Sequence, residues 1–268
     1  MKILLGDPRH NTVGAHSYFT PIGIGYIGSN ILRQFKKDNI ELKLCTNPKE
    51  IFDLLKNWKP DIVGISNYIW NSYLANLICK QAKKIKSNTL CILGGPEFPA
   101  GTGQRKIENT SLDKTYDKCL KYLIDRPSVD YFVWTDGEPT FIEIIKKFKK
   151  HKFSVKSLKD KDEPIKGCAS LSKNKKKLII GEYLSRVGMD GSVKAQGRDV
   201  IPSPYTTGLL DKFLDGTFVP AFETARGCPF LCTFCDQGLD QTKITTFSVG
   251  RLSEEMMYVG KKLSQIKN

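Results

Sequence analysis

"DIVGISN", residues 61–67, is an apolar run that lacks the polar–apolar alternation of a half-buried strand. Strands of this kind are buried on both faces, as in parallel sheets that carry helices on each side. Four further segments read as strands: "KILLGD" (2–7), "IELKLC" (40–45), "TLCILGGP" (89–96) and "DYFVWTDG" (130–137). Together they predict five strands in one sheet.

Helical patterns alternate with these strands. Pro21 opens the first helix, Asn47 and Pro48 start the second, and Pro139 lies at the start of the last. Another helix follows residue 67, and each helix carries an apolar stripe at helical spacing. The alternation predicts an α/β fold for residues 1–150, with a doubly wound, parallel, five-stranded Rossmann-like sheet.

The remaining residues have a different character. Residues 151–217 are predicted to form a short hairpin from "GCASLS" (167–172) and "KKLIIGEYL" (176–184), followed by a linker. A strand, "TFVPAFETA" (217–225), is predicted to open the last region, residues 218–268, which ends in a helix capped by Ser253.

Composition narrows the classes of function. The net charge is +14, but only 8 of the 42 basic residues are arginine, the residue that makes bidentate contacts with bases and phosphates. Nucleic-acid binding is therefore not favoured. No apolar run is long enough for a membrane span or a signal peptide. Eight cysteines without a secretion signal favour the cytoplasm, where reduced thiols serve metals or catalysis.

A second decisive stretch is "ETARGCPFLCTFCDQG", residues 223–238, which places Cys228, Cys232 and Cys235 on one loop. Each of the four irons of a 4Fe–4S cluster needs an outer ligand, so three thiolates leave one iron open to a substrate. A zinc site with Cys168 as fourth ligand is an alternative, although zinc sites usually pair two C-x2-C units. Three cysteines packed together by chance is the remaining alternative.

This loop resembles that of the radical S-adenosylmethionine (SAM) superfamily. The resemblance implies that Cys228, Cys232 and Cys235 hold a 4Fe–4S cluster whose open iron binds SAM. It also implies that Phe234, just before the third cysteine, lies near the adenine. In that family one electron cleaves SAM to methionine and a 5′-deoxyadenosyl radical.

The whole chain is similar to radical SAM proteins with a cobalamin-binding domain. The similarity is carried by "TPIGIGYIGSNI" on the first predicted helix, "PDIVGISN", "ILGGPE", "DGEPT" and the linker "IPSPYTTGLLD" before the cysteine loop. It implies a Rossmann-like cobalamin-binding domain, followed by the first βα unit of a partial radical SAM barrel.

The strand ends are the expected cobalamin site, because ligands of doubly wound sheets bind beyond the carboxyl ends of the strands. Glycines there admit the nucleotide tail close to the backbone, and a serine hydroxyl can bind its phosphate or base. All of these residues are also ordinary turn formers. The candidates are Ser66, Asn67, Gly94, Gly95, Pro96, Asp136, Gly137 and Glu138.

Three features depart from known patterns. "GIGYIG" (23–28) matches a dinucleotide fingerprint but lies inside a helical stripe, so close helix packing is the better explanation. Asp7 and His10 do not have the D-x-H-x-x-G spacing that places a histidine on cobalt, so we expect no histidine ligand. Residues 136–138 read Asp-Gly-Glu, where the family usually has Gly-Glu-Gly-Glu.

The sequence predicts a cobalamin-dependent radical SAM enzyme or its front part, with methyl transfer as one outcome. Expected cofactors are a 4Fe–4S cluster, SAM and cobalamin; expected partners are a small-molecule substrate and an electron donor such as ferredoxin or flavodoxin. Because only one βα unit is present, a second chain could complete the barrel. A non-catalytic cobalamin-binding module and a zinc-bearing nucleic-acid binder remain alternatives.

Overall fold

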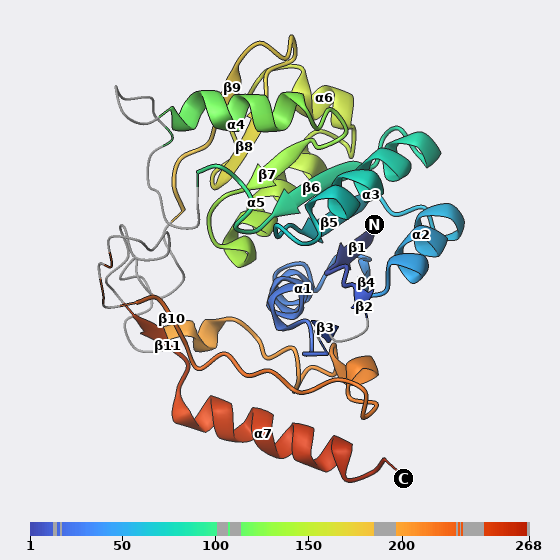
Figure 1. Cartoon of the computed structure of the whole chain (residues 1–268), viewed down its shortest axis with the longest axis vertical. Coiled ribbons are helices and arrows are strands. Elements are labelled where there is room, and N and C mark those ends of the chain that lie inside the picture. Colours follow the sequence, from blue (N-terminus) through green and yellow to red (C-terminus); the bar gives the residue numbers. More distant parts are fainter. Residues whose placement is uncertain are drawn as a thin grey trace.

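Five parallel strands form the centre of a single sheet (Figure 1). The computed structural model describes residues 1–12, 15–16, 18–100, 107, 114–184, 197–228, 230, 232 and 244–266. The parallel strands run in the spatial order β4-β1-β5-β6-β7. Their bounds are β1 (Lys2–Gly6), β4 (Glu41–Cys45), β5 (Ile62–Ser66), β6 (Leu90–Gly94) and β7 (Tyr131–Val133). All five predicted strands are confirmed.

A hairpin extends this sheet beyond β7. β8 (Cys168–Leu171) pairs antiparallel with β7, and β9 (Leu178–Ile180) pairs antiparallel with β8. The hairpin predicted from "GCASLS" and "KKLIIGEYL" is confirmed. Its attachment to the main sheet, which covers the otherwise open edge of β7, was not predicted.

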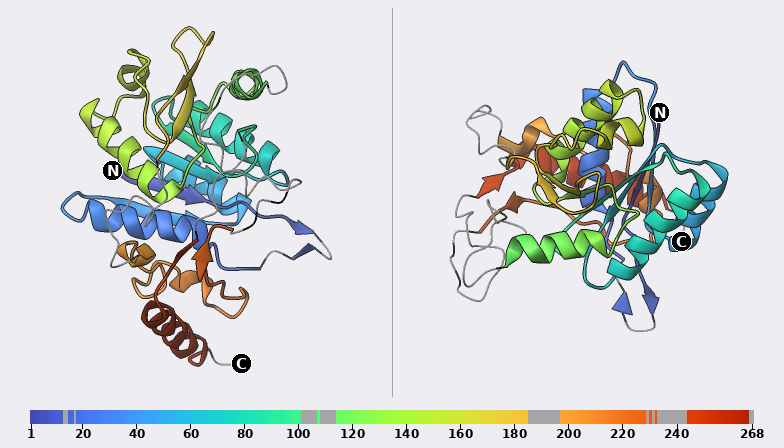
Figure 2. Two further views of the ribbon diagram at one scale, coloured as in Figure 1. Left: turned by 90° about the vertical axis from the view of Figure 1, so that its left-hand side faces the viewer. Right: turned by 90° about the horizontal axis from the view of Figure 1, so that it is seen from above.

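Helices cover both faces of the sheet (Figure 2). On one face lie α1 (Ile22–Gln34), α5 (Gly137–Lys150) and α6 (Val155–Lys159). On the other lie α2 (Pro48–Asn57), α3 (Ser72–Ile85) and α4 (Thr115–Ile124). The doubly wound arrangement is confirmed, with α4 and α6 as unpredicted additions. Because β1 lies between β4 and β5, the strand order reverses there, and this switch point is where such sheets bind ligands.

The linker packs between α1 and the last helix, α7 (Val249–Leu263), as Figure 1 shows. Within it, two short 3₁₀ helices span Gly197–Val200 (η1) and Asp211–Phe213 (η2). A Cβ on Gly25 would lie 2.9 Å from Pro204 Cβ, and one on Gly28 would lie 2.8 Å from Leu209 Cδ2. The glycines of "GIGYIG" therefore let the linker approach α1 closely, which is a packing role.

The last region differs from its prediction at two points. The segment 217–224 is not a continuous strand, because its β-pairing among the described residues is limited to an isolated parallel bridge between Val219 and Phe19. The next contacts go to side chains: Ala221 N donates to Thr20 Oγ1 (3.0 Å), and Tyr205 OH donates to Ala221 O (2.7 Å). The strand found within the predicted range is β10 (Ala225–Arg226), which pairs with β11 (Thr245–Thr246).

The other difference is the start of α7. Ser248, and not Ser253, caps this helix, since its side chain accepts from Arg251 N at 3.1 Å. Ser253 lies inside the helix, and Glu255 is buried there in an ion pair with Arg251 (2.7 Å). By contrast, the predicted Asn47 cap of α2 is confirmed, because its side chain accepts from Lys49 N and Glu50 N.

Among the described residues, no helix combines the length and the apolar character needed to cross a bilayer.

The close contact at Gly25 gives a first prediction. Gly25→Ala should lower the free energy of unfolding by about 1–3 kcal/mol, because the new methyl group overpacks the contact with Pro204. Gly23→Ala is the matched control in the same helix: a Cβ there meets nothing within 4 Å, so this variant should be neutral or stabilised by about 0.5–1 kcal/mol. Urea unfolding measures both. Equal stabilities for the two variants would contradict the close docking of the linker.

Candidate functional site

A cavity of about 460 Å³ lies at the carboxyl ends of β1, β5, β6 and β7, with residues of α1 and α5 in its walls. This volume is within the range of small-molecule and cofactor sites. Its inner wall is apolar and is formed by Leu5, Ile65, Ile92, Val133 and Phe141. The cavity thus occupies the strand ends around the switch point of the sheet.

Most of the strand-end residues predicted from the sequence meet in this cavity. Its lining includes Ser66, Gly94, Gly95, Pro96, Asp136, Gly137 and Glu138. Asn67 is not part of the lining. It is fully buried, its Oδ1 accepts from Tyr122 OH at 2.5 Å, and its backbone lies against Gly95. Asn67 therefore supports the cavity wall from behind.

Polar groups near β1 and β5 are already paired with one another. Ser66 Oγ donates to Asp7 Oδ1 at 2.5 Å, and Arg9 Nη2 lies 2.7 Å from Asp7 Oδ2. Ser66 and Asp7 line the cavity, whereas His10 is not among the lining residues, and its Nε2 lies 2.6 Å from the backbone oxygen of Trp70. The Ser66 oxygen can still accept a hydrogen bond from a ligand.

The glycines of the cavity have different local constraints. Gly95 has φ +137°, and a Cβ there would lie 2.5 Å from the backbone oxygen of Asn67, so this position requires glycine for the fold itself. Gly23, at the start of α1, lines the cavity, and a Cβ there meets nothing within 4 Å. Gly23 therefore leaves space at the cavity wall without being required for packing.

The cysteine loop borders the same cavity. Arg226, Gly227 and Cys228 belong to its lining, and Cys228 is half-buried while Cys232 is exposed. Cys235 and Phe234 lie outside the described residues, as do their contacts. In the described part of the chain, no three histidine, cysteine or acidic side chains converge as a metal site. Pairing of β10 with β11 brings the two ends of the loop together at its base.

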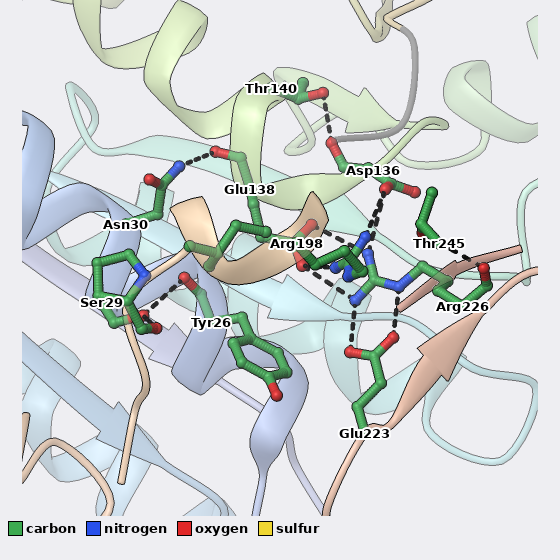
Figure 3. Close-up of polar contacts among 12 residues, drawn as sticks. Tyr26, Ser29, Asn30, Asp136, Glu138, Thr140, Arg198, Glu223, Arg226 and Thr245 are labelled. Carbon is green, nitrogen blue, oxygen red and sulfur yellow. Dashed lines mark hydrogen bonds and ion pairs between the residues drawn. The ribbon is translucent and has the colours of Figure 1, made fainter. Parts of the chain in front are cut away.

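Arg226 binds three carboxylates, of which Asp136 and Glu138 tie the loop to the strand ends (Figure 3). Its Nε and Nη2 donate to Glu223 at 2.6 and 2.8 Å. Its Nη2 and Nη1 donate to the two oxygens of Glu138 at 3.0 and 3.2 Å, and Nη1 also donates to Asp136 at 3.2 Å. Bidentate arginine–carboxylate pairs of this kind are strong and fix geometry.

A second arginine, Arg198 of η1, reaches the same carboxylates. It is fully buried, with Nη2 3.3 Å from Glu138 Oε1 and Nη1 3.7 Å from Asp136 Oδ2. Its guanidinium also lies over the ring of Phe247 (5.3 Å to the centroid), as does that of Arg251 at 5.1 Å. Arg198 thus brings the linker into the ion cluster, which we define as Asp136, Glu138, Arg198, Glu223 and Arg226, and Phe247 packs beside it.

Charge compensation decides the ionisation of Glu138. Burial of this carboxyl would raise its pKa, but Arg226 and Arg198 more than offset that effect, so the pKa of Glu138 is lowered from its ordinary value. The opposite charges likewise raise the pKa of Arg226 despite its burial. Asp136 occupies the N-cap position of α5 without capping it through its side chain, which points to the arginines instead.

Sequence reasoning placed Glu138 at the strand ends but missed the ion cluster. The only signals were the Arg226 that precedes Gly227 and Cys228, and the Asp-Gly-Glu at 136–138. No periodicity or spacing rule connects residues so far apart in the chain, so the pairing required the structure.

The lowered pKa of Glu138 predicts a pH dependence. A carboxylate whose folded pKa is depressed contributes stability above its unfolded value, here 4.5, and loses it as the pH falls through the folded pKa. Glu138→Gln should therefore lower the free energy of unfolding at pH 7, by about 3 kcal/mol for one partner of a buried pair. Its difference from the wild type should shrink below about pH 4.5.

Asp160→Asn is the control, because Asp160 forms an exposed pair with Lys173 that should contribute little. Denaturant unfolding between pH 3 and pH 7 measures the three proteins. If the difference in free energy of unfolding between the wild type and Glu138→Gln were the same at pH 3 and pH 7, the charge of Glu138 would contribute nothing to stability.

No protein-family model matches the chain. An uncharacterized methyltransferase of Pyrococcus horikoshii is 28% identical over 263 residues, which are 96% of this chain and 50% of that protein. TokK of Streptomyces tokunonensis, a cobalamin-dependent radical SAM methyltransferase, is 23% identical over 210 residues, which are 74% of this chain and 25% of TokK.

The fold has a counterpart among solved structures. OxsB, a cobalamin-dependent S-adenosylmethionine radical enzyme solved with aqua-cobalamin bound, matches with a TM-score of 0.66 and 19% identity. The match covers 98% of this chain and 32% of OxsB. The chain thus spans about half the length of the Pyrococcus relative and smaller shares of TokK and OxsB. In sequence and fold, it resembles the cobalamin-dependent radical SAM proteins.

Proposed function

We propose that this chain forms the cobalamin-binding and cluster-binding part of a radical SAM enzyme whose chemistry is methyl transfer. One observation carries the proposal: the strand-end residues and Cys228 of the cysteine loop line a single cavity. A cofactor on the sheet and a cluster on the loop would therefore face each other. The methyltransferase relatives and the OxsB-like fold support the same reading.

The cavity fits part of a cobalamin. The flat, largely apolar base of its nucleotide tail suits the apolar inner wall, and Gly94 and Gly95 let it approach the backbone. Ser66 Oγ can accept a hydrogen bond from the tail. We assign the contacts to Ser66, Gly94, Gly95, Pro96 and Gly137, with Asn67 as support behind Gly95.

The cysteine chemistry fits a cluster on the loop. Cys228 and Cys232 are the described cysteines that are not buried, whereas the other five described cysteines lie in the core. Burial raises the pKa of Cys45 to about 12 and raises that of Cys168 as well, so these thiols are poor sources of the thiolate that metals need. This disfavours a zinc site completed by Cys168.

When bound, the cluster would supply the electron that cleaves SAM, and cobalamin would carry the methyl group. The strand-end residues would hold the cobalamin and the cysteines would hold the cluster at one cavity, which would limit the entry of water between them. Phe234 remains the proposed adenine neighbour. We likewise propose further SAM contacts, a small-molecule substrate, an electron donor and a second chain that completes the barrel.

Iron analysis tests the cluster. Anaerobic reconstitution with iron and sulfide should load about four irons and about four sulfides per chain, because three thiolates hold one cubane cluster. Cys228→Ala, Cys232→Ala or Cys235→Ala should each abolish loading. Cys45→Ala and Cys168→Ala, which alter buried cysteines, are the controls and should load normally if folded. Stoichiometric zinc without sulfide would support the zinc alternative and contradict the cluster.

Gly23 offers a clean test of cobalamin binding. Gly23→Leu should place a side chain at the cavity wall and weaken methylcobalamin binding by about tenfold or more, while it replaces a helical glycine with a better helix former. Gly260→Leu is the matched control, because Gly260 is also helical, and a Cβ there also meets nothing within 4 Å.

Absorbance titration in the dark measures the affinities. Equal affinity in wild type and Gly23→Leu would place the cobalamin elsewhere. Gly95 is unsuitable for this test, since any side chain there collides with the backbone of Asn67. Methylcobalamin binding without any iron loading would favour the non-catalytic cobalamin-binding module.

A further inference from the structure

Next to the cysteine loop, the Arg226 side chain makes the hydrogen bonds to the strand-end residues Asp136 and Glu138. β10 is two residues long and pairs only with β11 among the described strands, so the main sheet does not hold it. The preceding segment, 217–224, is bonded further from the loop: Val219 forms an isolated parallel bridge with Phe19, and Ala221 bonds to Thr20 Oγ1 and Tyr205 OH. The position of Cys228 relative to the strand ends therefore depends on the residues next to it.

Arg226 is the residue best placed to set that position. Its planar guanidinium uses Nε, Nη1 and Nη2 on Glu223, Glu138 and Asp136, so the side chain has one favourable orientation. The side chains of Glu138 and Asp136 are 4% and 14% exposed, and both residues belong to the start of α5. A lysine could keep the charge but could not form two bidentate pairs.

Gly227 links the anchored Arg226 to Cys228. Its φ of +116° is one that residues with side chains rarely adopt. This turn lies between the residue that binds the strand-end carboxylates and the cysteine that lines the cavity. A single residue therefore separates the anchored Arg226 from Cys228.

We infer that Arg226 is a positioning residue: through Glu138 and Asp136 it holds Cys228 against the cavity, and it thereby couples the thiols of the loop to the occupant of the strand ends. The inference deepens the proposed function, on which its cofactor part rests. Arg198 supports the same carboxylates from the linker, so the coupling involves three segments distant in the sequence. By linkage, such coupling acts equally in both directions.

The positioning role of Arg226 can be tested without any cofactor. In reduced, cluster-free protein, iodoacetamide should modify half-buried Cys228 more slowly than exposed Cys232 of the same molecule. Arg226→Met should raise the rate of Cys228 relative to Cys232 by about fivefold, the low end for coupled sites. Arg226→Lys should give an intermediate ratio, because it keeps the charge and loses the fork. Tandem mass spectrometry of the loop peptide measures the ratio.

Lys83→Met is the matched control. It breaks the Lys83–Asp130 ion pair (2.6 Å). The side chains of this pair are 20% and 12% exposed, which is close to the 24% of Arg226 and the 14% of Asp136. This pair lies outside the ion cluster, so the variant should lose stability without changing the Cys228-to-Cys232 ratio. A ratio that stays at the wild-type value in folded Arg226→Met would overturn the inference. If that variant does not fold, Arg226→Lys decides in the same way.

Methylcobalamin then tests the coupling. Saturating ligand should slow modification of wild-type Cys228 by about fivefold relative to Cys232, and Arg226→Lys should lose most of this protection while still binding the ligand. Binding without protection in the wild type would refute the coupling. An absence of methylcobalamin binding would refute the cobalamin part of the proposed function, and the ratio without ligand would still decide the role of Arg226.

Discussion

The buried carboxylate of Glu138 is the constraint on which the arrangement of the chain depends. A charge with almost no exposure is tolerated only when opposite charges and hydrogen bonds compensate for lost hydration. Glu138 belongs to the first turn of α5, but its compensation comes from Arg198 in the linker and Arg226 beside the cysteine loop. Satisfying one side chain therefore requires three segments of the chain to converge on the carboxyl edge of the sheet.

This convergence explains why one cavity has two different walls. The sheet contributes backbone-rich strand ends with glycines and a serine, which suit a large ligand that binds close to the main chain. The loop contributes Cys228 and the arginine that anchors it. A parallel sheet alone would offer only the first wall. The ion cluster adds the second, and its side chains are mostly buried, so bulk salt should screen it little.

The sequence carried most information where local signals and burial agree. Runs such as "DIVGISN" and the Asn47 cap predicted the sheet and α2 correctly, because each feature is determined within a few residues. The prediction that α7 starts at Ser253 was wrong, because Ser248 is equally suited to capping. Glu255, expected in the first turn, forms an ion pair with Arg251 inside the helix. "TFVPAFETA" has the composition of a strand, but its pairing with a neighbouring backbone is limited to the Val219–Phe19 bridge, and Ala221 bonds to the side chains of Thr20 and Tyr205 instead. Likewise, nothing near Glu138 in the sequence indicates that its partners are residues 198 and 226.

The central claim is that a cofactor at the strand ends and a cluster on the cysteine loop face one cavity. Electron paramagnetic resonance of the full chain, loaded with cob(II)alamin and a reduced 4Fe–4S cluster, tests it most directly. Two paramagnetic centres that share one cavity should broaden or split each other's signals. A spectrum equal to the sum of those from protein loaded with either centre alone would contradict the shared cavity.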